Sequence, residues 1–133
     1  MAMDTNVSED LAAVQLEMAG AVATLTLNRP DRLNAMNAGM DQQLRKQFEV
    51  ASADANCRVI VITGAGKGFC SGADQEPVVA GATHAVPWNP LPPSVAEFRF
   101  GYLLESPKPV IAALNGAAIG VGLVLASYCD IRL

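Results

Sequence analysis

The fold is decided by the stretch Arg58-Val59-Ile60-Val61-Ile62-Thr63-Gly64-Ala65-Gly66-Lys67-Gly68. Its first half is a continuous β-branched run, which is typical of a strand covered on both faces in a parallel sheet. Its second half opens a glycine-rich turn that continues to Asp74. In α/β proteins such a turn lies at the carboxyl end of its strand, where ligands bind.

A second strand and turn of the same kind follow later in the chain. The strand is predicted over residues 110–114, and the turn after it is Asn115-Gly116-Ala117-Ala118-Ile119-Gly120-Val121-Gly122. Residues 120–129 are small and apolar, which favours a buried helix, and residues 130–133 begin a further strand. Because glycine-rich backbone can come close to a ligand, the two turns together could aim two N–H donors at one oxygen atom.

The remaining segments complete an α/β pattern with right-handed crossovers. Residues 14–18 and 22–27 alternate like the strands of a hairpin, and the proline-rich residues 76–93 are predicted to form a long loop. Asn37 is expected to cap a helix that runs to about Asp54, and Ser94 a short helix that runs to Ser106. The residues expected to face inward are Met40, Leu44, Phe48 and Ala51 on the first helix and Val95, Phe98, Tyr102 and Leu103 on the second.

Composition narrows the class of protein. Of the 133 residues 51% are hydrophobic, which is enough for one domain with a core. Residues 1–10 are expected to be a flexible N-terminus and residues 11–133 a single unit without a linker. The net charge of -4 argues against a nucleic-acid partner, which requires clustered cations. Three cysteines without metal-ligand spacing, and no run long enough to span a membrane, favour a cytoplasmic protein without a metal site.

Familiar glycine motifs do not account for the two turns. A P-loop fails because Val61 stands where its first glycine belongs, and a dinucleotide fingerprint fails because Phe69 and Leu125 replace the third glycine. A serine nucleophile elbow around Ser71 lacks its first glycine, since Phe69 stands there as well. On composition alone, turns that serve only tight packing are the better explanation.

Four motifs nevertheless occur together in a defined order. They are Leu27-Asn28-Arg29-Pro30 with Leu33-Asn34-Ala35, Val61-Ile62-Thr63-Gly64 through Phe69-Cys70-Ser71-Gly72-Ala73-Asp74, Pro107-Lys108-Pro109-Val110-Ile111-Ala112-Ala113, and Asn115-Gly116 through Cys129-Asp130-Ile131-Arg132. In this order they resemble the amino-terminal half of the enoyl-CoA hydratase/isomerase (crotonase) superfamily. The resemblance implies a crotonase-like spiral of ββα units with a mostly parallel sheet, incomplete at the C-terminus.

The resemblance also implies which residues act on a substrate. In that family the backbone N–H groups at the positions of Ala73 and Val121 bind the thioester oxygen, although Val121 replaces the usual glycine. Arg32 could meet a coenzyme A phosphate or be a solvated loop arginine, and Asp74 is better explained as a loop or helix-cap residue than as a catalytic acid. The positions that would bind the substrate are Arg32, Leu33, Ala35, Ser71, Gly72, Asp74, Gln75 and Gly120.

One position departs from the hydratases of that family, which use two glutamates. Val124 stands at the first glutamate position, and the second would lie beyond Leu133. An aliphatic side chain can neither activate water nor protonate carbon. The remaining candidate carboxylates form no acid/base pair and are expected to have surface or capping roles; they are Glu76, Glu97 and Asp130.

Two functions therefore stay open. The first is an acyl-CoA isomerase or hydratase-like enzyme that stabilises a thioester enolate, with no cofactor beyond the coenzyme A thioester substrate and with a homotrimer or hexamer as its assembly. The second is a non-catalytic acyl-CoA-binding or oligomerisation module. A serine hydrolase of the same fold would need a histidine near its serine, but His84 lies in the proline-rich loop and is expected to face solvent. Cys70 is expected to be a small buried residue.

Overall fold

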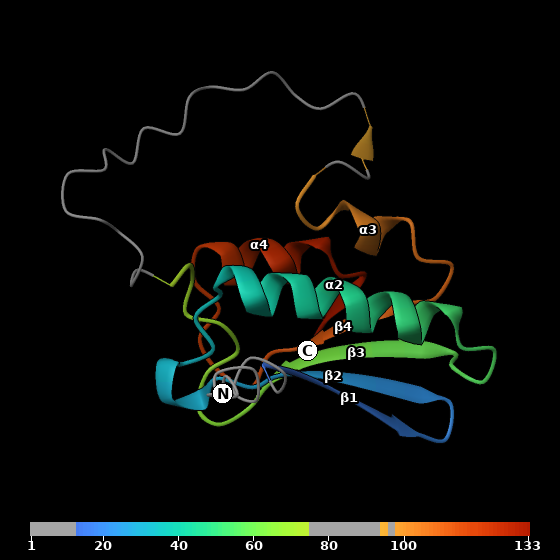
Figure 1. Cartoon of the computed structure of the whole chain (residues 1–133), viewed down its shortest axis with the longest axis horizontal. Helices are drawn as coiled ribbons and strands as arrows, with labels where there is room; N and C mark the ends of the chain where they lie inside the picture. The colour runs from blue at the N-terminus through green and yellow to red at the C-terminus, as the bar shows by residue number, and fades with distance from the viewer. Residues whose placement is uncertain (1–12, 75–93, 96–97) are drawn as a thin grey trace, which may run out of the picture.

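A sheet with helices on one side makes up the described part of the chain, residues 13–74, 94–95 and 98–133 of a computed structural model (Figure 1). The five strands lie side by side in chain order, with β1 antiparallel to β2 and all later neighbours parallel. The predicted hairpin and the parallel crossovers are confirmed. The elements are β1 (Val14–Ala19), β2 (Val22–Leu27), η1 (Pro30–Arg32), α2 (Ala38–Ala53), β3 (Val59–Gly64), α3 (Gly101–Leu104), β4 (Val110–Ala113), α4 (Val121–Tyr128) and β5 (Ile131–Arg132).

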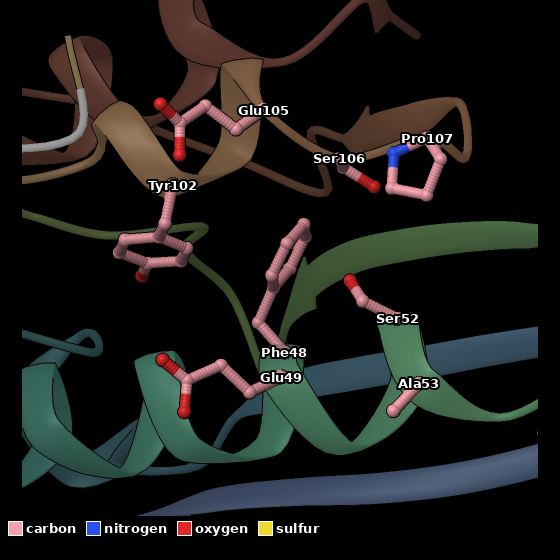
Figure 2. A pocket seen from close by; sticks show the side chains of 8 residues that line it. All are labelled: Phe48, Glu49, Ser52, Ala53, Tyr102, Glu105, Ser106 and Pro107. Atoms are coloured by element: carbon pink, nitrogen blue, oxygen red, sulfur yellow. The ribbon is translucent and has the colours of Figure 1, made fainter.

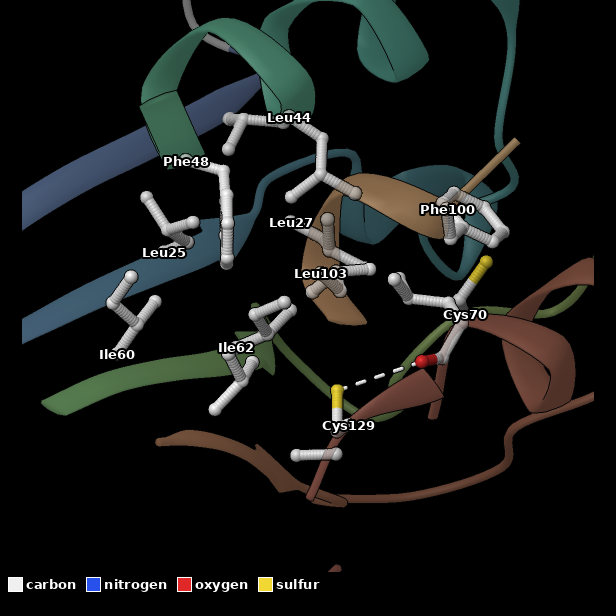
Figure 3. Packing of buried hydrophobic residues seen from close by; sticks show 14 of the residues in the cluster. Leu25, Leu27, Leu44, Phe48, Ile60, Ile62, Cys70, Phe100, Leu103 and Cys129 are labelled. Atoms are coloured by element: carbon white, nitrogen blue, oxygen red, sulfur yellow. Dashed lines mark hydrogen bonds between the residues drawn. The ribbon is translucent and has the colours of Figure 1, made fainter. Parts of the chain in front are cut away.

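Helix α2 begins and packs as its sequence predicts. The Asn37 side chain accepts a hydrogen bond of 2.8 Å from the Met40 backbone N–H, which satisfies one of the free donors of the first turn. The four predicted inward residues are all buried. Figure 3 shows Leu44 and Phe48 of this stripe against the sheet residues Leu25 and Ile62. The apolar stripe of α2 and one face of the sheet therefore form the core.

Helices cover only one face of the sheet in the described part of the chain. Along β3, Ile60 and Ile62 are buried on the side of the helices, whereas Val59 and Val61 are only partly buried. The prediction that this strand is covered on both faces is therefore wrong for the described residues. A continuous β-branched run shows that a strand is apolar on both sides, but it does not show what packs there.

The predicted helix over residues 94–106 is also wrong in extent. Helix α3 includes only Gly101–Leu104, and Val95, expected to face inward, is 45% exposed. Phe100 is fully buried against Tyr128, while Phe98 is only partly buried. The burial of Tyr102 and Leu103 is as predicted. Phe100 has a non-helical backbone (φ -114°, ψ 17°) just before Gly101, so the helix starts later than its apolar spacing suggests.

Helix α4 was expected to be buried, but it shows an apolar outer face. Gly122, Leu125 and Ala126 are buried, whereas Leu123 and Val124 are 54% and 46% exposed. The predicted flexible N-terminus (residues 1–10) and the proline-rich loop lie outside the described residues. Within the described ranges, no helix has the length and apolar character needed to span a bilayer.

The core predicts a clear difference between two substitutions on α2. Leu44→Ala removes a fully buried side chain and should lower the free energy of unfolding by about 3 kcal/mol, because the cavity closes only partly. Val50→Ala on the same helix is the control, since Val50 is 51% exposed, and it should change stability by less than about 0.5 kcal/mol. Urea denaturation of both variants measures the difference; equal losses would contradict the assigned core.

Candidate active site

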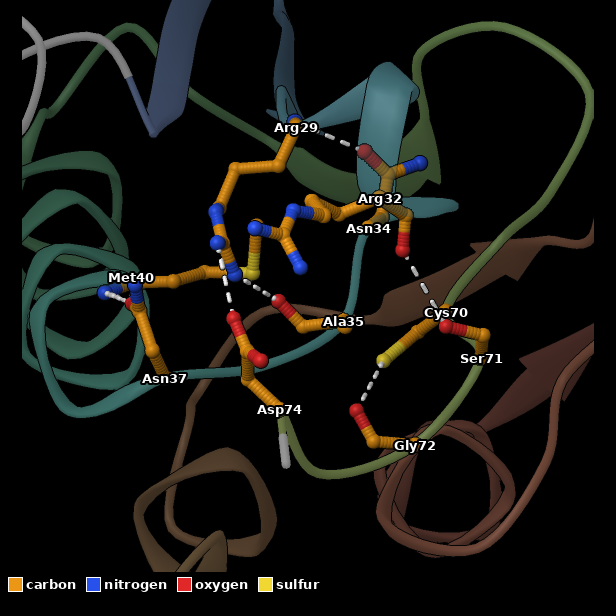
Figure 4. A network of polar contacts seen from close by, with 10 residues as sticks. All are labelled: Arg29, Arg32, Asn34, Ala35, Asn37, Met40, Cys70, Ser71, Gly72 and Asp74. Carbon is orange, nitrogen blue, oxygen red and sulfur yellow. Dashed lines mark hydrogen bonds and ion pairs between the residues drawn. The ribbon is translucent and has the colours of Figure 1, made fainter. Parts of the chain in front are cut away.

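Three loops meet where β2, β3 and β4 end (Figure 4). The loop after β2 forms a parallel bridge between Met36 and Ala73, and the turn after β4 forms one between Ala118 and Cys70. Backbone hydrogen bonds support both bridges, with Met36 N–H donating to the Gly72 carbonyl at 2.8 Å and Ile119 N–H to the Cys70 carbonyl at 3.0 Å. The turn after β3 is thus held between the other two loops, as expected for neighbouring parallel strands.

Asn34 fixes the turn after β3 from one side. It is fully buried, and its Oδ1 accepts from the Arg29 backbone N–H at 2.8 Å. Its Nδ2 donates to the carbonyls of Ala65 at 3.0 Å and Gly68 at 2.9 Å. A buried amide is tolerated only when its hydrogen bonds are made, so this side chain belongs to the loop framework.

Asn115 fixes the same turn from the other side. Its Oδ1 accepts from the Gly64 N–H at 3.0 Å, and its Nδ2 donates to the carbonyls of Gly66 at 3.0 Å and Gly68 at 3.1 Å. The Gly68 carbonyl therefore accepts from two asparagine side chains that belong to different loops. Neither asparagine was predicted to have this role, although both stand in the motifs that carry the family resemblance.

Two glycines are required because backbone packs against them. A Cβ atom on Gly122 would overlap the Cys70 carbonyl oxygen, and one on Gly116 would overlap the carbonyl oxygen of Lys67. No side chain can move aside to make room, because the obstructing atoms are main chain. These glycines allow the turn after β4 to approach the turn after β3 within van der Waals contact.

An ion pair that was not predicted joins the loop after β2 to the end of the turn after β3. Arg29 Nη2 lies 2.8 Å from Asp74 Oδ2, and the two side chains are 19% and 7% exposed. Arg29 Nη1 also donates to the Ala35 carbonyl. Asp74 was predicted to contact substrate or to act as a loop or helix-cap residue, and its carboxylate pairs with this guanidinium. The motif Leu27-Asn28-Arg29-Pro30 was the only signal for Arg29 in the sequence.

The backbone amides of Ala73 and Val121, which the family resemblance singles out, lie at this end of the sheet as well. Neither N–H donates to another group in the part of the chain that the structure describes. Val121 is the first residue of α4, so its amide has no partner within the helix and lies at the positive end of the helix dipole. The residues just before the two amides are close, since a Cβ on Gly120 would lie 3.8 Å from the Gly72 Cα.

The predicted substrate-binding residues that the structure describes lie in the same loops and differ in exposure. Arg32 and Leu33 are exposed, Leu33 at 48% and with a left-handed backbone (φ 49°). Ser71 is partly buried and is hydrogen-bonded to the loop after β2. Its N–H donates to the Leu33 carbonyl at 3.0 Å, and its hydroxyl donates to the Arg32 carbonyl at 3.3 Å. Ala35 is partly buried, and Gln75 lies outside the described residues.

No acid/base pair stands beside the amides in the described ranges. Val124 is on the outer face of α4, a helix without an acidic residue. Asp130 Oδ2 accepts from the Val110 N–H at 2.8 Å, which is a structural role as expected. Cys70 is fully buried, and burial raises the pKa of its thiol, so it is a packing residue rather than an activated nucleophile. The other residues considered, His84, Glu76 and Glu97, lie outside the described residues.

Comparison with known proteins identifies the family. The family model for enoyl-CoA hydratase/isomerase matches residues 17–133. A "probable enoyl-CoA hydratase" of Mycobacterium tuberculosis is 41% identical over 114 residues, and the match covers 84% of this chain and 43% of that protein. The 1,2-epoxyphenylacetyl-CoA isomerase of Escherichia coli is 40% identical over 119 residues, with 83% of this chain and 42% of that protein covered. The chain therefore belongs to the enoyl-CoA hydratase/isomerase family.

A solved structure supports the same assignment. The crystal structure of an enoyl-CoA hydratase/carnithine racemase from Magnetospirillum magneticum matches with a TM-score of 0.73 and 38% identity. The match covers 90% of this chain and 45% of that one. The crotonase fold expected from the four motifs is confirmed, and the chain spans about half the length of the relatives that it matches.

The asparagine contacts predict a large effect from a substitution of similar size. Asn34→Asp keeps an oxygen for the Arg29 N–H but removes both donated hydrogen bonds and introduces a buried charge. We expect a loss of about 3 kcal/mol in the free energy of unfolding at neutral pH. Asn56→Asp is the control, because Asn56 is exposed in a turn, and it should be nearly neutral. Urea denaturation measures the free energy of unfolding of both variants. Similar losses for Asn34→Asp and Asn56→Asp would show that Asn34 does not hold the loops.

Proposed function

We propose that this chain binds an acyl-CoA thioester and stabilises the enolate form of its carbonyl between the amides of Ala73 and Val121. The observation that carries the proposal is that two backbone N–H groups, from turns far apart in sequence, lack a partner in the described residues at one end of the sheet. Negative charge develops on the thioester oxygen during enolisation, so donors fixed there stabilise the transition state more than the ground state.

The framework around the amides supports this role. A donor contributes most to catalysis when it needs no reorganisation as charge develops. The hydrogen bonds of Asn34 and Asn115 hold the turn that leads to Ala73, and Gly122 lets the start of α4 lie against the Cys70 backbone. Exposed Arg32 and Leu33, with Ala35 and Ser71 beside them, form the surface proposed for the coenzyme A moiety.

The second candidate function is binding without turnover. Its supporting observation is Val124, an aliphatic and 46% exposed residue where the family's hydratases carry a glutamate. A protein of this kind would hold acyl-CoA, or join an oligomer, without activating water. For the complete protein we favour isomerisation or a hydratase-like reaction whose base lies outside this chain. We also propose assembly as a trimer or hexamer, which sedimentation measures directly.

Substitution of Val121 can remove one amide hydrogen without removing the helix. Proline lacks the N–H and is well tolerated as the first residue of a helix. Gly120 has ψ -122°, outside the α region that a following proline excludes. Val121→Pro should lower turnover of the complete protein about a hundredfold with little change in thermal stability. Val121→Gly keeps the donor and is the matched control; equal turnover of the two variants would eliminate Val121 as a catalytic donor.

Val124→Glu separates the reactions that the family resemblance allows. If the complete protein is a hydratase that lacks one carboxylate, the new glutamate should raise hydration about a hundredfold. If it is an isomerase whose base lies elsewhere, isomerisation should fall or stay constant. The measurement is the rates of hydration and of double-bond migration for the wild type and for Val124→Glu, each in the complete protein. Substantial hydration by the wild type that Val124→Glu does not increase would show that another group supplies the base.

A further inference from the structure

One guanidinium contacts both segments that meet beside Ala73 (Figure 4). Arg29 Nη2 pairs with the Asp74 carboxylate, and Arg29 Nη1 donates to the Ala35 carbonyl. Met36 and Ala73 form the parallel bridge between the loop after β2 and the turn after β3. Ala35 immediately precedes one member of this bridge, and Asp74 immediately follows the other. The guanidinium therefore holds both sides of the bridge at once.

The same bridge determines which way the Ala73 N–H points. The Met36 N–H donates to the Gly72 carbonyl at 2.8 Å, and the Met36 carbonyl accepts from the Asp74 N–H at 2.9 Å. These hydrogen bonds use the residues before and after Ala73, so the N–H of Ala73 itself projects to the opposite side of its segment. The direction of this amide is therefore set by its two neighbours in the chain.

The ion pair is well placed to keep this geometry. Both of its side chains are mostly buried, whereas Ala73 is exposed. A planar guanidinium that contacts two acceptors fixes direction as well as distance. The Arg29 backbone is itself held, because its N–H donates to Asn34 Oδ1 and its carbonyl accepts from the Asn34 N–H at 2.9 Å. A fixed guanidinium thus sets the position of Asp74 and, through it, that of Ala73.

We propose that Arg29 and Asp74 are positioning residues that aim the Ala73 N–H at the thioester oxygen. The inference rests on the acyl-CoA function proposed above and adds two side chains that act on the reaction through a backbone donor. A misdirected donor weakens its hydrogen bond most in the transition state, where the charge on the oxygen is largest. Loss of the ion pair should therefore lower kcat and leave KM nearly unchanged.

Steady-state kinetics of the complete protein test this split. In Arg29→Lys the positive charge remains, but an ammonium cannot hold Asp74 and the Ala35 carbonyl in the same geometry. We expect kcat to fall about tenfold, which is less than the loss when a donor is removed altogether, and KM to change by less than about twofold. Asp74→Asn removes the charge at nearly constant size and should act in the same way. An unchanged kcat in both variants, or a raised KM with unchanged kcat, would overturn the proposal.

A second ion pair in the chain offers matched controls. Arg45 and Glu49 pair at 3.2 Å on α2, and both side chains are more than half exposed. Glu49 lines a cavity between α2 and α3 together with Ala53, the last residue of α2 (Figure 2). Arg45→Lys and Glu49→Gln make the same chemical changes at this place and should leave kcat at the wild-type value. A fall in kcat as large as in the Arg29 and Asp74 variants would contradict a specific role for the pair beside Ala73.

The carbonyl stretching frequency of a bound acyl-CoA, labelled with ¹³C at the thioester carbon, separates aiming from folding. Only folded protein binds the thioester, so a loss of stability alone leaves the frequency of the bound carbonyl at the wild-type value. Because the Val121 donor remains, Arg29→Lys and Asp74→Asn should each keep about half of the wild-type shift to lower frequency. The full shift in both variants would overturn the positioning role and leave the acyl-CoA function standing. No shift in the wild type would refute the acyl-CoA function, and this inference with it.

Discussion

The Gly68 carbonyl accepts hydrogen bonds from two asparagine side chains, Asn34 on the loop after β2 and Asn115 on the turn after β4. Each asparagine also bonds further backbone groups of the turn after β3, so one short stretch of main chain is held from both sides. Phe69 and Cys70 of the turn are fully buried, but the glycine-rich part before them, residues 64–68, has only the side chains of Ala65 and Lys67. Its conformation therefore depends on these side-chain amides, and the position of Ala73 depends on that conformation.

The glycines and the asparagines have complementary roles in this arrangement. Gly116 and Gly122 remove the side chains that would keep the turn after β4 away from the backbone of residues 67 and 70. Close approach then lets the parallel bridge between Cys70 and Ala118 form, and it brings the start of α4 to the same end of the sheet as Ala73. The ion pair between Arg29 and Asp74 fixes the chain on the other side of Ala73. The two amides thus belong to a framework that is held by the asparagine hydrogen bonds and by this ion pair.

Local patterns predicted local structure well, and contacts between distant segments poorly. The cap at Asn37 and the buried stripe of α2 follow from residue spacing within one helix, and the structure has both. Helix α3 was predicted too long because the apolar spacing runs back to Val95, whereas Phe100 has a non-helical backbone and its ring packs on Tyr128, which is remote in sequence. The Arg29 to Asp74 pair spans 45 residues and leaves no periodic signal. The positions of Ala73 and Val121 came from family resemblance, since a backbone amide has no sequence signature of its own.

The central claim is that the two amides polarise a thioester carbonyl, and the most direct measurement is the infrared stretching frequency of that bond. An acyl-CoA labelled with ¹³C at the thioester carbon reports this carbonyl against the protein background. Donation from the Ala73 and Val121 N–H groups weakens the C=O bond, so the account predicts a shift to lower frequency when the labelled thioester binds. A bound thioester with the same carbonyl frequency as in water would contradict the account.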